Sequence, residues 1–189
     1  MSAIRNRPNV YLALLLSLAL AGCQAAGSAY AQKPQRAGPI CAVYFSPHGG
    51  CTEEVVKEIG QARASVLVQA YSFTSAPIAQ ALVEAHRRGV DVEVILDKSQ
   101  RTEHHSSAGS LAKAGVPVEI DAAHAIAHNK VMVIDGRTVL TGSFNFTDSA
   151  EERNAENLVV IRDAEMAARY AANWRSHREH ATPYLPAGN

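Results

Sequence analysis

The sequence has no excess of charge of either sign. Its 189 residues carry 18 Lys and Arg against 18 Asp and Glu, and removing Arg5 and Arg7 with an N-terminal signal would tip the balance to the acidic side. A broad basic surface, the usual electrostatic mark of a nucleic-acid-binding domain, is therefore not predicted. The basic residues that could still follow a phosphate backbone locally are Lys98, Arg101, Arg137 and Arg153.

The start of the chain lacks a hydrophobic run long enough to cross a membrane. The apolar segment from Val10 to Ala21 follows Arg5 and Arg7, and it is shorter than the roughly 20 residues that a spanning helix needs. A short basic region before such a segment is typical of a signal peptide, which we place at residues 1–22. The protein is therefore predicted to be exported.

Two processing sites compete for the end of this signal. Leu20-Ala21-Gly22-Cys23 resembles the bacterial lipoprotein box, in which the cysteine is lipidated, and Ala29-Tyr30-Ala31 resembles a small-x-small site with cleavage before Gln32. The first is slightly favoured, because the second would leave a long polar stretch after the apolar run. We expect a periplasmic protein or a lipoprotein anchored to the membrane through Cys23, with a polar linker over residues 23–39.

Cysteine is scarce, with Cys23, Cys41 and Cys51 the three in the chain. If Cys23 is lipidated or removed, an even pair remains on either side of a turn-rich segment, and outside the cytoplasm a Cys41–Cys51 disulfide is predicted. The alternative is two buried thiols. No group of His and Cys has the spacing of zinc ligands, so no metal or other cofactor is expected. The adjacent His104 and His105 fit a polar loop.

The most informative residues that are present lie between positions 128 and 145. His128 and Lys130 are two apart on a β-prone segment, so their side chains share one face. Ser143 and Asn145 follow the next β-prone segment and add a hydroxyl and an amide. An imidazole, an ammonium and neutral hydrogen-bonding groups in one corner suit a phosphate and its more highly charged transition state.

Two further residues complete this pattern. Asp135-Gly136 lies between the two segments and is a strong signal for a hairpin turn, which by itself explains the aspartate. Gly142 lets backbone approach a ligand closely. The order His-x-Lys, Asp135 and Gly-Ser-x-Asn resembles the signature of the phospholipase D superfamily, whose members cut phosphodiester bonds.

The resemblance implies roles for these residues. His128 would attack phosphorus and form a phosphohistidine, Lys130, Ser143 and Asn145 would hold the phosphate oxygens, and Asp135 would belong to the catalytic motif, though its turn position favours support of the hairpin. Glu156, in Asn154-Ala155-Glu156-Asn157, matches the glutamate that orients the catalytic histidine in nuclease-like members. Glu152 is the weaker rival.

The chain contains one copy of this motif. The family reaction uses one histidine as nucleophile and a second as general acid, and the small bacterial endonucleases of the superfamily supply the second through a two-fold dimer. The resemblance therefore implies a homodimer with a shared site, in which His128 of a second copy is the acid and no metal is required. An acid within the chain is the alternative, with His124 the first candidate.

Alternating strand and helix signals predict an α/β fold, a layered mixed β-sheet flanked by helices, over residues 40–180, with a C-terminal tail at 181–189. Strands are expected at 40–45, 65–73, 91–96, near 120, at 129–134, 138–141 and 158–161, and helices at 52–62, 75–89, 108–114 and 164–178. The polar side chains of Tyr71 to Thr74 either line the cleft or belong to a packed strand end.

Three functions remain open on the sequence. The first is an exported, sequence-nonspecific endonuclease acting on DNA or RNA, which the small size and single motif favour. The second is a phospholipase D that releases phospholipid head groups, consistent with a lipid anchor. The third is an inactive binding module, against which the intact motif argues.

Overall fold

The computed structural model describes residues 40–186. The predicted signal peptide, the linker at 23–39 and the lipidation candidate Cys23 lie outside these residues and stay predictions. Among the helices of residues 40–186, none combines the length and the apolar character needed to cross a membrane.

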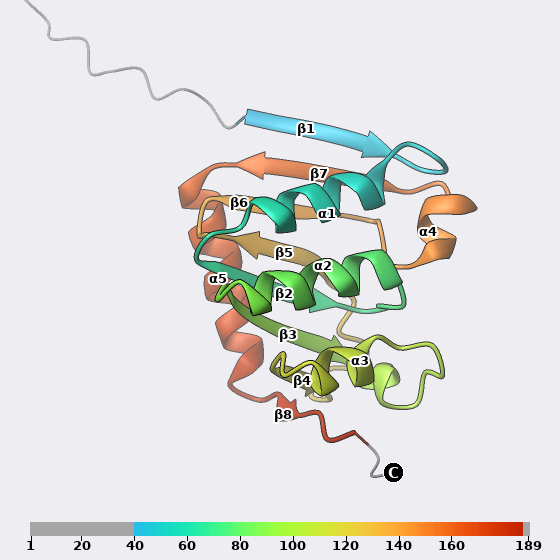
Figure 1. Cartoon of the computed structure of the whole chain (residues 1–189), viewed down its shortest axis with the longest axis vertical. Coiled ribbons are helices and arrows are strands. Elements are labelled where there is room, and N and C mark those ends of the chain that lie inside the picture. Colours follow the sequence, from blue (N-terminus) through green and yellow to red (C-terminus); the bar gives the residue numbers. More distant parts are fainter. Residues whose placement is uncertain (1–39, 187–189) are drawn as a thin grey trace, which may run out of the picture. The chain divides into compact units, whose positions relative to one another are not determined.

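The described chain is built on one mixed sheet of eight strands in the order β1-β7-β6-β5-β2-β3-β4-β8 (Figure 1). The strands β2, β3 and β4 are parallel, and every other neighbouring pair is antiparallel. The strands are β1 Ile40–Phe45, β2 Ser65–Ala70, β3 Asp91–Asp97, β4 Val118–Asp121, β5 Lys130–Ile134, β6 Thr138–Gly142, β7 Asn157–Arg162 and β8 Thr182–Pro183.

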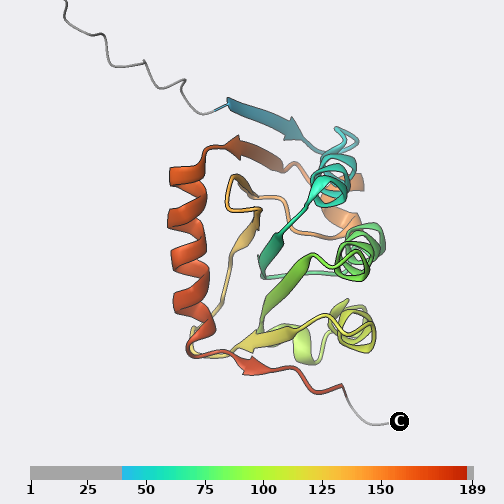
Figure 2. The same cartoon turned by 60° about the vertical axis from the view of Figure 1, so that its left-hand side comes forward.

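Helices cover both faces of this sheet. The helices α1, α2 and α3 lie on one face and α5 lies on the other, as Figure 2 shows. The helices are α1 Cys51–Gln61, α2 Ala76–Arg87, α3 Ala108–Lys113, α4 Asp148–Glu152 and α5 Ala164–Arg178, with a 3-10 turn at Lys98–Arg101. This is the predicted α/β fold, a mixed sheet flanked by helices.

Burial of the strands follows from these layers. All five residues of β5 are buried, because helices cover both of its faces, and a strand in that position is a continuous apolar run. The edge strand β1 instead alternates: Ala42 and Tyr44 pack on the core beside α1, whereas Cys41, Val43 and Phe45 are exposed. The two patterns tell a central strand from an edge strand.

That alternation contradicts the predicted disulfide. Cys41 and Cys51 are both free cysteines, the first exposed and the second fully buried. Cys51 begins α1 and belongs to the core on the face that Ala42 and Tyr44 share, while Cys41 points to the opposite face of β1. Burial raises the pKa of the Cys51 thiol to about 11, so it stays protonated in the core.

Other differences from the expected elements are small. The strand expected at 65–73 ends at Ala70, and the segment after it leaves the sheet as a loop. Residues 182–183, placed in the tail by the sequence, pair with β4 as the edge strand β8. The short helix α4 had no periodic signal in the sequence; Thr147 caps it by accepting a hydrogen bond from the Ala150 N–H.

Candidate active site

The topology brings the motif residues to one edge of the sheet. β5 runs antiparallel to both β2 and β6, so its first residue, Lys130, lies opposite Ala70 at the end of β2 and close to the end of β6. At the end of β6, Gly142 pairs with Leu158 near the start of β7. His128, Lys130, Ser143 and Glu156 therefore come from adjacent strand ends, although they span 29 positions of sequence.

Lys130 is the most constrained of these side chains. It is only 7% exposed, its Nζ donates to the backbone oxygen of His128 at 2.9 Å, and it lies 5.1 Å from the centre of the Tyr71 ring. Burial lowers the pKa of Lys130, and the carboxylate of Glu156 opposes that change. A buried ammonium with few partners is held where an anionic substrate can neutralise it.

His128 is exposed, and its ring lies against Tyr71 with 4.6 Å between ring centres and an angle of 49° between the rings. The same tyrosine thus lies beside both His128 and Lys130. The bond expected between Glu156 and His128 is not among the hydrogen bonds of residues 40–186. Glu156 accepts a hydrogen bond from the side chain of Asn154 at 3.2 Å instead. It affects the site electrostatically, because its carboxylate opposes the effect of burial on the pKa of Lys130.

Gly142 and Ser143 meet the backbone of Asn157. The Ser143 hydroxyl accepts from the Asn157 N–H at 3.0 Å and from the Asn157 side chain at 3.4 Å, so its own O–H can donate to a phosphate oxygen. A Cβ at Gly142, where φ is 143°, would lie 2.2 Å from the Asn157 oxygen. The sequence analysis expected Gly142 to allow close approach of a ligand. The structure shows instead that glycine is needed here because strand β7 approaches closely.

Asn145 faces an open groove of about 720 Å³ beside this corner. Its Oδ1 is buried and has no hydrogen-bond partner within residues 40–186, which is costly unless a ligand or water supplies a donor. The other side chains along the groove are predominantly polar. They are Tyr71, Ser72, Thr74, Glu103, His105, Thr147, Asp148, Ser149, Arg153 and Asn154, so two carboxylates and an imidazole are among them.

The segment from Tyr71 to Thr74 fulfils both of the readings given to it. Tyr71, Ser72 and Thr74 line the groove. Phe73 between them is fully buried and packs edge-on against Phe146, with 5.8 Å between ring centres. Packing of Phe73 against Phe146 therefore holds the polar neighbours of Phe73 at the rim.

Asp135 does not belong to the site, and its place among the catalytic candidates is corrected. It lies in the turn at the far end of β5, with φ of 52°, followed by Gly136 with φ of 61°. Its carboxylate accepts the backbone N–H groups of Arg63, Ala64 and Ser65 at 2.7 to 3.2 Å. The motif aspartate ties the β5–β6 hairpin to the start of β2, as its turn position had favoured.

The rival candidates are engaged elsewhere. Glu152 pairs with His48 at 3.2 Å, and the Nδ1 of His124 lies 3.0 Å from the buried carboxylate of Asp121, which removes His124 as the obvious second acid.

Of the basic candidates, Arg153 lines the groove, whereas Lys98 donates to the His124 oxygen and Arg101 to Thr182. Arg137 lies in the hairpin turn beside Asp135, at the end of β5 opposite Lys130.

One group of side chains was missed by the sequence analysis, which found no metal-ligand spacing. Asp121, His124, His177 and His180 come together, with ligand atoms within 4.8 Å of one another. The first two residues are more than 50 positions from the last two in the sequence, and the fold brings the two pairs together. The signal that could have suggested each half is a pair of ligand residues three positions apart, at 121 and 124 and at 177 and 180.

Comparisons with known proteins match most of the described chain. The family described as "Cardiolipin synthase, PLD-like domain" matches residues 55–178. A phospholipase D of Rickettsia bellii is 45% identical over 134 residues, which are 71% of this chain and 67% of that protein.

Two solved structures share the fold over nearly their whole length. Nuc of Salmonella typhimurium, a phospholipase D family member, is 38% identical with a TM-score of 0.75, over 77% of this chain and 98% of that one. NucT of Helicobacter pylori is 26% identical with a TM-score of 0.72, over 77% of this chain and 99% of that one.

Proposed function

The chain belongs to the phospholipase D superfamily and is a phosphodiesterase, and from this premise we propose that it is an exported endonuclease that cuts DNA or RNA without sequence preference. The observation that carries the proposal is the corner formed by exposed His128 and buried Lys130 beside a polar, open groove. Export rests on the signal-like residues 1–22, and anchoring in the membrane would require lipidation of Cys23.

The reaction we propose has two steps. An imidazole nitrogen of His128 attacks phosphorus, the bond from phosphorus to the leaving oxygen breaks, and a second, protonated imidazole gives its proton to that oxygen. Water then attacks the phosphohistidine, the same second imidazole takes the proton of the water, and His128 is released. Lys130 and the Ser143 hydroxyl stabilise the charge that grows on the phosphate oxygens, and Asn145 binds the phosphate through its amide.

The second imidazole is assigned to a second copy of the chain. The sequence holds one copy of the motif, His128 is open to solvent, and His124 is bonded to Asp121. A two-fold axis near His128 would place two copies of the residue opposite each other and supply both roles. No metal is needed for this chemistry, because the positive charge comes from Lys130 and the protonated imidazole.

The groove supports nucleic acid over lipid as substrate. Its hydroxyl, amide and guanidinium groups can contact sugar and phosphate, although Glu103 and Asp148 also line it, and Tyr71 adds an aromatic side chain to the lining. Acyl chains would need an apolar channel, whereas the groove beside the motif is lined mainly by polar side chains.

A phospholipase D activity is the second candidate. It is favoured by the relative named phospholipase D, at 45% identity. Two large apolar side chains, Phe45 and Ile126, are 63% and 56% exposed, and Ile126 lies two positions before His128. Contact of these side chains with a bilayer would be the simplest way for this domain to reach a lipid head group.

One purified sample separates the candidates. Nicking of supercoiled plasmid, and degradation of single-stranded RNA, are measured beside release of head groups from phospholipid vesicles, with His128→Ala as the control. The proposal expects strand cleavage that is lost in His128→Ala, and little head-group release. Head-group release at a much higher kcat/KM than plasmid nicking would replace the endonuclease with a phospholipase.

A further inference from the structure

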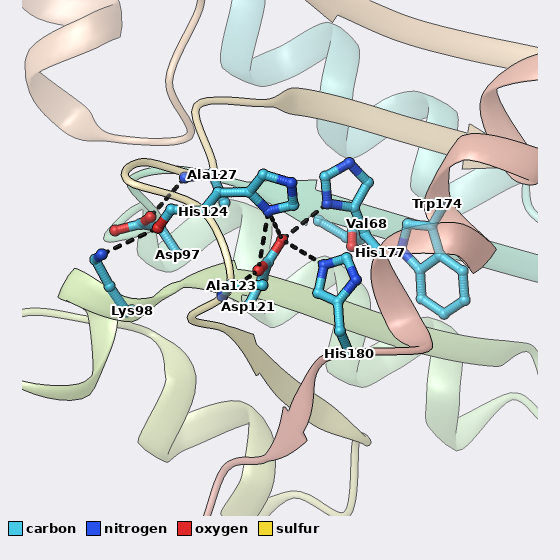
Figure 3. A network of polar contacts seen from close by, with 10 residues as sticks. All are labelled: Val68, Asp97, Lys98, Asp121, Ala123, His124, Ala127, Trp174, His177 and His180. Carbon is cyan, nitrogen blue, oxygen red and sulfur yellow. Dashed lines mark hydrogen bonds and ion pairs between the residues drawn. The ribbon is translucent and has the colours of Figure 1, made fainter.

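Four side chains outside the catalytic corner meet at one point. Asp121 ends β4, His124 lies three positions later in the following loop, His177 lies near the end of α5, and His180 follows that helix (Figure 3). None of their recorded contacts reaches His128 or Lys130. The cluster is therefore a separate feature, which the proposed hydrolysis does not use.

The three imidazoles converge on one carboxylate oxygen of Asp121. The Oδ2 of Asp121 lies 2.8 Å from Nδ1 of His177, 3.0 Å from Nδ1 of His124 and 3.3 Å from Nε2 of His180. The three imidazole rings lie 4.8 to 5.5 Å apart between centres. In Figure 3 the three rings surround the Asp121 carboxylate from different sides.

Hydrogen bonding alone would use every lone-pair site of this carboxylate. Oδ1 accepts the Ala123 N–H at 3.0 Å and lies 3.2 Å from Nδ1 of His124, and Oδ2 faces the other two imidazoles. Each ring would also have to present an N–H to the same small space. A cation at the centre lets all three rings act as lone-pair donors beside the carboxylate.

The donor set and its dimensions suit zinc. Three imidazoles and one carboxylate give four ligands of the kinds that Zn²⁺ takes, and bonds of about 2.1 Å place tetrahedral ligand atoms roughly 3.4 Å apart. The distances from Asp121 already lie near that value, and the widest separation of 4.8 Å must shorten. His124 and His180 have side chains 45% and 36% exposed, so they have room to rotate inward.

We propose that Asp121, His124, His177 and His180 bind one zinc-type divalent cation per chain. Because all four positions are filled by protein ligands, the site is structural and holds no open position for a substrate. It fastens the end of α5 to the loop that leads into His128. On the other side, the Asp97 carboxylate accepts the Ala127 N–H at 2.7 Å and Lys98 holds the His124 oxygen at 3.0 Å.

The loop from Ala122 to Ile126 is exposed and has no regular hydrogen-bonded structure, and these ties are what define its path. The hydrogen bonds from Asp97 and Lys98 tie the loop to β3 and the turn after it. The cation would add a third connection, to α5 on the opposite face of the sheet. Trp174 anchors that part of α5, with its ring nitrogen donating to the Val68 oxygen at 2.8 Å (Figure 3). The cation would thus connect the rigid end of α5 to the residues just before the nucleophile.

The test uses the untagged exported chain, stripped with chelator and then titrated with Zn²⁺ in competition with a chromophoric chelator. We expect one zinc per chain, a midpoint of thermal unfolding raised by several degrees, and, with Co²⁺ in place of zinc, the intense visible absorption of tetrahedral coordination. His180→Ala and His177→Ala should each weaken zinc binding by at least tenfold. His86→Ala, which removes an imidazole from α2, should bind as wild type does.

His180 lies after α5 and is partly exposed, so His180→Ala should fold even if His177→Ala does not. Zinc binding by His180→Ala with wild-type affinity would overturn the assignment, as would a wild-type chain that takes up no zinc and shows no change in thermal unfolding. These readouts do not involve cleavage of any substrate. Failure of the zinc site and failure of the proposed nuclease are therefore distinguished.

Discussion

At the scale of single residues, the proposed mechanism gives Lys130 the main electrostatic role. Within residues 40–186 its buried ammonium lies against the Tyr71 ring and donates a hydrogen bond to the His128 oxygen, so its charge could act on a bound phosphate. We predict that Lys130→Met lowers kcat by about 10²- to 10³-fold, the range found when one preorganised stabilising group is removed. Steady-state kinetics on a defined oligonucleotide measures this.

The matched control for that variant is Lys113→Met, which removes an exposed ammonium at the end of α3. It should leave kcat unchanged. If Lys130→Met raised only KM and kept kcat, the ammonium would contribute to substrate binding and not to the transition state.

Asp135 should act on stability and not on turnover. Burial raises the pKa of this carboxyl, but the N–H groups of Ala64, Ser65 and Arg63 outweigh that effect and the pKa is lowered overall. We predict that Asp135→Asn reduces the free energy of unfolding by about 1.5–3 kcal/mol, as for hydrogen bonds to a charged group, with kcat unchanged where both proteins are folded. Urea unfolding at neutral pH measures the first quantity.

The stabilisation by Asp135 should depend on pH in a defined direction. Since the folded pKa of Asp135 lies below its value of 3.8 in the unfolded chain, its stabilisation is present above that pH and is lost as the pH falls through the folded pKa. The difference between wild type and Asp135→Asn should therefore shrink as urea unfolding is repeated below pH 4. A difference that stays constant down to pH 2 would contradict the role of the charge.

Single-residue patterns predicted the site only in part. His128 and Lys130 could be found because strand alternation and motif spacing are local properties. The motif alone did not indicate that Asp135 contacts the start of β2, at the opposite end of β5 from Lys130. The Asp-Gly turn signal did indicate a role in the hairpin. Glu156 has the expected position, but its hydrogen-bond partner depends on where Asn154 folds, and spacing does not reveal that.

At the scale of elements, the junction of β6 and β7 positions Ser143. Gly142→Ala would bring a Cβ within 2.2 Å of the Asn157 oxygen, at a φ that side chains rarely adopt. The clash would push β7 away from β6 and break the bonds from Asn157 to the Ser143 hydroxyl, and the φ adds local backbone strain. We predict lower thermal stability together with a loss of kcat, measured on the same preparation by thermal unfolding and plasmid nicking.

Gly60→Ala is the control for that variant. Gly60 lies within α1 with open space around its Cα, so alanine there should stabilise the protein slightly, by about 0.5–1 kcal/mol, and leave activity unchanged. A Gly142→Ala protein as stable and as active as Gly60→Ala would show that β6 and β7 can separate without harm to the site.

Removal of metal is the second prediction at this scale. The proposed zinc site secures α5 and the loop before His128, but it contributes no atom to the phosphate-binding corner. In chelator, at a temperature well below unfolding, plasmid nicking should continue at a rate within a few-fold of that of the untreated protein. Abrupt loss of nicking by folded protein, restored by added metal, would place a cation in the chemistry itself.

The longer helices and strands could be predicted with boundaries good to a few residues, because apolar periodicity is a local property. The relation between elements could not. Cys41 and Cys51 are close in sequence, yet strand alternation and the start of α1 place them on opposite sides of β1. In the same way β8 joins the sheet only because α5 returns the chain to β4.

At the scale of the whole molecule, the proposed mechanism needs a second copy of the chain. One chain would provide the nucleophile, Lys130 and the phosphate-binding groups, and His128 of the second copy would be the acid. The two histidine roles also require opposite protonation states, so the rate should depend on pH as a bell-shaped curve that belongs to the coupled pair. Zero formal charge further predicts that binding to nucleic acid rests on local contacts in the groove.

Activity of a heterodimer tests the shared site most directly. Wild-type and His128→Ala chains are coexpressed with different removable tags, the mixed dimer is isolated by sequential affinity steps, and its plasmid nicking is compared with that of both homodimers. The account predicts a dimer by sedimentation and nicking by the mixed dimer at least about 10²-fold below wild type, since its one interface holds a single imidazole. A mixed dimer with half the wild-type activity, or a fully active monomer, would contradict it.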